Sequence, residues 1–181
     1  MRPIWISAAA LAAALGFACA AYAGPGYDDH AVEANAIASM TAADYLAAAG
    51  RDDVYEIRAA QLAQTHANSP EVRSAASRLL AGQKTEEAAM KRDLELAGMG
   101  DIPPPPLDDR RIVMLGELQA ASGPDFDRIF IEQQRSAGEE ALALHRGYAR
   151  HGQDGVLKSA AHHAELMAAK RLSLLDDLPG A

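Results

Sequence analysis

The sequence has a single cysteine, Cys19, among its 181 residues, and aromatic residues make up only 5% of it. β-branched residues are also few, and they never alternate with polar residues over a useful length, so the chain lacks a strand pattern. Cys19 falls inside an N-terminal apolar run. We therefore expect an all-α protein whose folded part has no disulfide and no thiolate metal site.

Motifs that carry chemistry are also missing. The chain has no glycine-rich phosphate loop and no serine in a nucleophile elbow. A Glu-x-x-His motif with a matching carboxylate on a second helix, as used in di-iron bundles, is absent as well. These absences favour a non-catalytic protein without a cofactor over an enzyme.

The N-terminus has the features of a secretory signal peptide. One positive charge near Met1 precedes the apolar run of residues 4–20, and Ala21-Tyr22-Ala23 fits the small-x-small rule for cleavage. We predict a signal peptide over residues 1–23, cleaved after Ala23, and a periplasmic or secreted protein. A membrane anchor is the alternative, although the run is near the lower limit for spanning. Lipidation of Cys19 is disfavoured because Gly16 stands where that motif normally has leucine.

The charge of the chain limits its partners. A formal net charge of −8 argues against nucleic acid and against anionic membrane surfaces. No later segment is apolar enough to cross a bilayer, so we expect no stable membrane span once the signal is cleaved. Residues 24–40 read as a flexible or partly helical leader. Residues 31–40 form the amphipathic part of this leader, which is compatible with binding to a protein partner or to a second copy of the chain (a homo-oligomer).

Helical periodicity covers the rest of the chain. Predicted helices run from about 41 to 67 and from about 70 to 97, separated by a break at Asn68-Ser69-Pro70. Four consecutive prolines, 103–106, predict an extended crossover. A third helical stretch begins near Asp108. Residues 122–124 bend the chain, Pro124 or Asp125 restarts the helix, and a last helix follows the link at residues 152–155. Residues 41–178 are thus predicted to form one four-helix bundle domain of two hairpins joined by a proline-rich crossover.

Each predicted seam carries one residue that is unusual in an apolar core, namely Glu56, Gln83, Gly138 and Arg171. Together with Glu86, the three polar residues form a candidate internal polar cluster. Arg171 has two interpretations. Its aliphatic stem could lie on the seam while its guanidinium reaches solvent, or it could pair internally with Glu56 or Glu86, because a buried carboxylate needs a cation.

Several of these segments resemble a known family. Ser69-Pro70-Glu71-Val72 in the first hairpin, and Ser122-Gly123 followed by Phe126-Asp127-Arg128 in the second, are similar to the domain-of-unknown-function family 4142. The resemblance implies an exported bacterial, ferritin-like helical bundle without an assigned activity. It also implies that three histidines of the family are replaced here by Gln83, Gly138 and Arg171, while the carboxylate at Glu56 is kept. An inherited metal site would then be lost, and we expect the cation of Arg171 and a void at Gly138 in its place.

Two remaining histidines offer a displaced metal site. His145 lies two turns from Gly138, and His163 lies two turns from Arg171, so antiparallel helices would bring both to a similar level. The alternative is that they are surface histidines without a role. The sequence therefore favours an exported helical bundle that acts as a non-catalytic binding or envelope-stress-associated protein. The alternative is a metal-binding ferritin-like bundle with a histidine site at His145 and His163.

Overall fold

The computed structural model describes residues 37, 39–96, 98–100, 102–103 and 105–178. Five helices lie in this part of the chain, and it contains no strand. Their bounds are α2 (Ala42–His66), α3 (Pro70–Leu96), α4 (Asp109–Ala120), α5 (Gly123–His151) and α6 (Gly155–Asp176). The prediction of an all-α bundle is confirmed.

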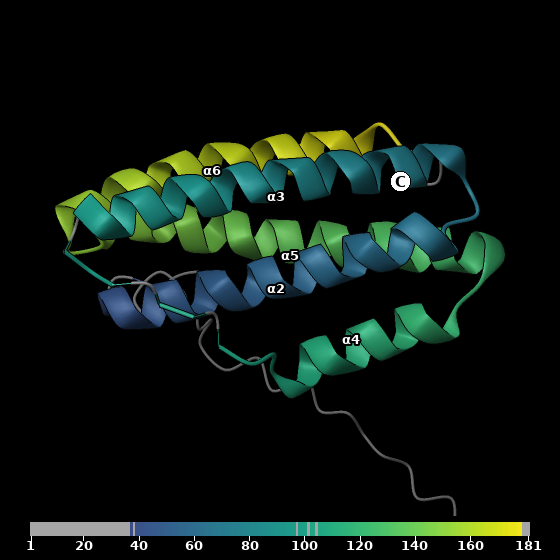
Figure 1. The fold of residues 1–181 in the computed structure, drawn as a ribbon, viewed down its shortest axis with the longest axis horizontal. Helices are drawn as coiled ribbons and strands as arrows, with labels where there is room; N and C mark the ends of the chain where they lie inside the picture. The colour runs from purple at the N-terminus through teal and green to yellow at the C-terminus, as the bar shows by residue number, and fades with distance from the viewer. Residues whose placement is uncertain (1–36, 38, 97, 101, 104, 179–181) are drawn as a thin grey trace, which may run out of the picture.

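The four long helices α2, α3, α5 and α6 lie side by side, and the shorter α4 runs along one side of them (Figure 1). The helices α2 and α3 form one hairpin, and α5 and α6 form the other. The predicted bend at residues 122–124 corresponds to a break at residues 121–122, and the restarted helix α5 begins at Gly123. As a result α4 packs against α2 and α5 as an added fifth helix.

Side chains at the helix ends explain where the helices begin. Thr41 forms a capping box with Asp44 at the start of α2. Asp108 and Asp154 each accept a hydrogen bond from a backbone N–H in the first turn of α4 and α6. Gly123, the first residue of α5, has a φ of +60°, a left-handed conformation that favours glycine. These local signals mark the starts of α2, α4, α5 and α6.

The apolar core is divided into two clusters along the bundle. One contains Phe126 and Phe130 together with Tyr55, and the other contains Tyr45, Tyr148 and Leu157. Between them along α2, α3 and α6 lie the polar residues that the sequence singled out. The bundle interior is therefore apolar at both ends and charged in its middle.

Gly138 does not leave a void. It is buried on α5, and a Cβ added there would meet Leu172 Cδ2 at 2.9 Å. The expectation that this position is an empty gap left by a missing side chain is wrong. Leu172 of α6 occupies the space, because a glycine lets the two helices approach closely.

The predicted signal peptide and most of the predicted leader lie outside the described residues. Of the leader, Ile37, Ser39 and Met40 are described, and Met40 packs against the cluster that contains Tyr45. A Cβ added at Gly147 of α5 would come within 2.5 Å of Ile37 Cγ2. The side chain of Ile37 therefore lies against the bundle. In the described part of the chain, no helix is long and apolar enough to cross a membrane.

Candidate functional site

A guanidinium is buried between two carboxylates in the middle of the bundle. Arg171 on α6 is 7% exposed, and its Nη1 donates to both carboxylate oxygens of Glu86 on α3, at 2.5 and 2.6 Å. Its Nε lies 3.2 Å from Glu56 Oε2 on α2. That nitrogen has no hydrogen-bond partner among the described residues, so the contact with Glu56 is ionic and poorly aligned. Interpreting Arg171 as an arginine whose head reaches solvent does not describe this arrangement.

Glu56 completes the cluster with an amide partner. Gln83 Nε2 donates to Glu56 Oε2, and both side chains are buried. Burial raises the pKa of Glu56, and the charge of Arg171 and the bond from Gln83 oppose that rise only in part. For Arg171, burial acts against the charged form, but Glu56 and Glu86 outweigh it and raise the pKa. The structure thus brings together all four residues of the candidate internal cluster.

A small cavity adjoins this cluster. It has a volume of about 30 Å³, enough for a water molecule or a single ion. Residues from α2, α3, α5 and α6 all line it. The polar side chains of the lining are Asp53, Glu86, Asp93, His145 and His163. The remaining lining residues are four alanines and Met90, so no lysine or arginine of the described chain faces this cavity.

His145 and His163 reach the same cavity from different helices. His145 on α5 is 4% exposed, and its Nδ1 lies 3.0 Å from the Tyr45 hydroxyl. Burial, with a contribution from Arg171, lowers the pKa of His145 to about 4, so the imidazole is neutral at pH 7. His163 on α6 is exposed. Its neighbour His162 does not line the cavity, as expected for adjacent residues on a helix.

Asp53 is a functional candidate that sequence reasoning missed. It is half-buried on α2, lines the cavity and makes no hydrogen bond within the described structure. Burial, together with the nearby charge of Glu56, raises the pKa of its carboxyl to about 7. In the sequence it stands in Asp52-Asp53, which reads as an ordinary pair on a solvated helix face.

As the side chains stand, no three histidine, cysteine, aspartate or glutamate residues of the described chain are arranged to hold a metal ion. The cavity does hold the ligand types that transition metals use, namely imidazole and carboxylate. It therefore offers the chemistry of a cation site without preformed coordination.

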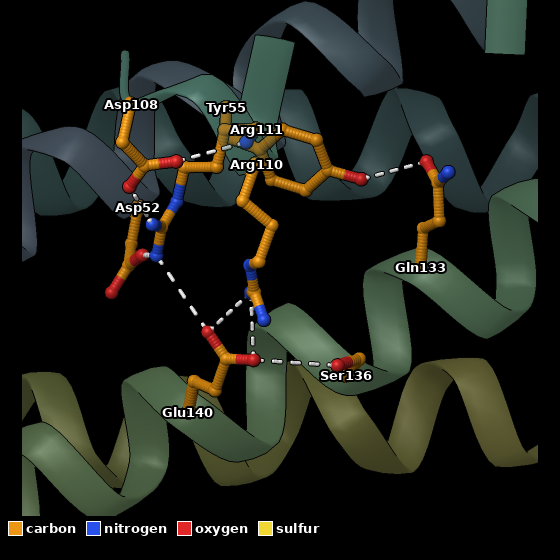
Figure 2. A network of polar contacts seen from close by, with 8 residues as sticks. All are labelled: Asp52, Tyr55, Asp108, Arg110, Arg111, Gln133, Ser136 and Glu140. Carbon is orange, nitrogen blue, oxygen red and sulfur yellow. Dashed lines mark hydrogen bonds and ion pairs between the residues drawn. The ribbon is translucent and has the colours of Figure 1, made fainter. Parts of the chain in front are cut away.

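A second polar network joins α4 to the bundle (Figure 2). Arg111 lies among three acidic groups: it bonds Asp108 at the start of its own helix, pairs with the buried Asp52 of α2, and lies 3.7 Å from Glu140 of α5. Arg110 donates to both oxygens of Glu140 from one nitrogen, at 2.7 and 2.6 Å. These contacts anchor α4 to two helices at once.

A chain of hydrogen bonds centred on Gln133 extends this network. The Tyr55 hydroxyl donates to Gln133 Oε1 at 2.9 Å, and Gln133 Nε2 donates to the carbonyl of Met114 and to Glu117. One amide on α5 thus connects α2 and α4. Sequence reasoning did not find this network, because its members are ordinary residues of helical seams.

Comparison with known proteins identifies the family. The model of the domain of unknown function DUF4142 matches residues 28–178, whereas no curated protein matches the chain in sequence. A solved structure of a presumed secreted DUF305 protein from Streptomyces coelicolor superposes with a TM-score of 0.57 at 16% identity, covering 74% of this chain and 89% of that chain. At this identity the likeness shows a shared fold alone. The family match spans most of the sequence, and the chain belongs to the DUF4142 family.

Proposed function

We propose that this protein is an exported, non-catalytic helical bundle of ferritin-like type. It lies in the periplasm, binds a ligand or a protein partner there, and is associated with envelope stress. The observation that carries the proposal is the pairing inside the central cluster. Arg171 contacts both Glu86 and Glu56, and Gln83 satisfies Glu56. Charged groups that neutralise one another in a dry interior support a folded scaffold more readily than a reactive centre.

Export is supported by the N-terminal pattern and by the DUF305 neighbour, which is itself described as presumed secreted. The test is fractionation of cells that express the untagged protein, followed by mass spectrometry of its N-terminus. We expect a periplasmic chain that begins at Gly24. An uncleaved chain in the membrane, or a lipid on Cys19, would contradict the proposal. For the envelope role, a deletion strain should grow poorly under detergent stress and recover with the wild-type gene.

Metal binding is a second candidate function, and one observation favours it. His145 and His163, which lie 18 positions apart in the sequence, line a single small cavity together with three carboxylates. Calorimetric titration of the untagged protein with zinc and with copper(II) tests this function. We expect one ion per chain, with binding lost in His163→Gln and kept in His162→Gln. Absence of binding by the wild-type protein to both ions would eliminate the candidate.

A further inference from the structure

The cavity beside Arg171 has a lining that suits one kind of ligand. Its polar residues are two imidazoles and three carboxylates, contributed by all four bundle helices, and no lysine or arginine among the described residues lines it. Its volume of about 30 Å³ excludes an organic ligand. Carboxylates gathered around such a confined space favour a cation. The inference that follows rests on the metal-binding function proposed above and defines the site in detail.

We propose that this cavity holds one divalent transition-metal ion, zinc or copper(II), bound by His145, His163 and Asp53, and that Tyr45 positions His145 for binding. Imidazole nitrogen with a single carboxylate suits zinc and copper(II), whereas calcium and magnesium prefer ligand sets made of oxygen alone. Three protein ligands leave a position for water, as in zinc sites that are not fully closed.

Asp53 is selected among the three carboxylates because it is free to bind. Glu86 already accepts two hydrogen bonds from Arg171, and withdrawing it would leave a buried guanidinium without its main partner. Asp93 is equally free of side-chain contacts in the described structure, but Asp53 is the carboxylate near Tyr45. Burial and then the charge of Asp53 raise the pKa of Tyr45, and Tyr45 contacts His145. The side chain of Asp53 makes no hydrogen bond within the described structure, although it faces the same cavity. Its side chain can therefore turn to an ion without breaking an existing contact.

His163 closes the site from the surface. It lines the cavity but is exposed, so its ring can change rotamer at little cost. This movement is needed because no three ligating groups are arranged around a common point in the described structure. The site is thus half-built: His145 is fixed in the interior, and His163 is recruited when the ion arrives.

Tyr45 fixes the orientation and the tautomer of His145. The Tyr45 hydroxyl lies 3.0 Å from His145 Nδ1, and the Tyr45 ring stacks on Tyr148 at a centroid distance of 4.0 Å, which holds the hydroxyl in place. When the hydroxyl accepts the hydrogen of Nδ1, the lone pair of Nε2 is left free for a metal ion. Such partners of a ligating histidine typically contribute a factor of about 10 to 100 in metal affinity.

The experiment compares zinc affinity, measured by titration against a competing chelator, in four single variants of the full, untagged protein. His163→Gln and Asp53→Asn each remove a ligand, and we expect zinc binding to weaken by at least about 100-fold. Tyr45→Phe keeps the stacked ring and removes only the hydroxyl, and we expect a loss of about 10- to 100-fold. His162→Gln is the matched control, an exposed histidine next to His163 that does not line the cavity, and its affinity should equal that of wild type.

Two further readouts separate the possible results. Circular dichroism confirms that each variant is folded, and the ¹⁵N shifts of the His145 ring report which nitrogen carries the proton. If wild type binds zinc and His163→Gln does not, but Asp53→Asn and Tyr45→Phe bind as wild type does, the metal-binding function stands and the present assignment is overturned. If wild type binds neither zinc nor copper(II), both are wrong. A proton on Nε2 of His145 in the zinc-bound protein would also overturn the role given to Tyr45.

Discussion

Arg171 and Glu86 come from different helices, yet a single nitrogen of the guanidinium lies 2.5 and 2.6 Å from the two oxygens of the carboxylate. Both side chains are almost completely removed from solvent. Such a pair contributes modestly to stability when intact, because both ions lose their hydration. Removing one partner is costly, because the other is left buried and unpaired.

Replacing Arg171 should therefore destabilise the bundle strongly. Arg171→Leu leaves Glu86 and Glu56 without their cation, and we expect a loss of about 3 to 5 kcal/mol in the free energy of unfolding, measured by urea denaturation at pH 7. The matched control is Arg135→Leu on α5, which removes a partly exposed pair with Asp176 and should cost less than about 1 kcal/mol. Equal losses in the two variants would show that the central pair is not needed for stability.

The pH dependence of stability should reveal the raised pKa of Glu56. Its pKa is raised in the folded state, mainly by burial, so the folded protein keeps the proton to higher pH than the unfolded chain does. Stability linked to Glu56 is then complete below its ordinary pKa and decreases as pH rises towards the folded-state value, by at most about 1.4 kcal/mol per pH unit.

Comparison of wild type with Glu56→Gln reports this contribution together with the part of the Asp53 pKa shift that the charge of Glu56 causes, and both act in the same direction. The amide keeps the shape of the side chain and cannot ionise. Denaturation across pH 4 to 8 should show the wild type losing stability relative to the variant as pH rises. A difference that is flat, or that grows with pH, would mean that Arg171 and Gln83 outweigh burial at this carboxylate.

The network of Figure 2 predicts that α4 opens separately from the rest of the bundle. Arg111→Met removes the cation that contacts the buried Asp52 and the N-cap Asp108. Only two residues of α4, Leu115 and Leu118, are buried, so few apolar contacts remain to hold it. We expect amide hydrogen exchange in α4 to accelerate at least about tenfold while α3 and α6 keep their protection. Arg128→Met, which removes an exposed pair on α5, should leave exchange in α4 unchanged, and uniform acceleration in all helices would argue against independent opening.

The sequence was sufficient to predict the helical bundle but not the contacts in its interior. Helical periodicity, the start of a helical stretch near Asp108 and the break before Pro70 are local signals, and the structure has the corresponding helix ends. The position of Arg171 beside Glu86 could be anticipated because a buried charge needs a partner. Which oxygen it contacts, and how α4 packs on α2 and α5, depend on packing between distant segments.

Asp53 and the Tyr55–Gln133 contact were not anticipated for the same physical reason. Aspartate and glutamine are common on solvated helix faces, and one sequence does not show which of them turn inward. The register between α2 and α5 decides this, since it places the Tyr55 hydroxyl at Gln133. Gly138 shows the reverse error, because a missing side chain suggested a gap that Leu172 fills.

Glycine-to-alanine substitutions in two helices provide a last test of the packing. A Cβ added at Gly82 on α3 would have nothing within 4 Å, whereas the same atom at Gly147 on α5 would come within 2.5 Å of Ile37. Gly82→Ala should therefore stabilise the protein by about 0.5 to 1 kcal/mol through helix propensity alone. Gly147→Ala should destabilise it, because the branched Ile37 would have to move away from α5.

Gly138→Ala should fall between them, since the propensity gain is offset by displacement of the flexible end of Leu172. Thermal melts of the three variants give the order directly. If Gly138→Ala were as stabilising as Gly82→Ala, the close approach of α5 and α6 at Leu172 would not exist in solution.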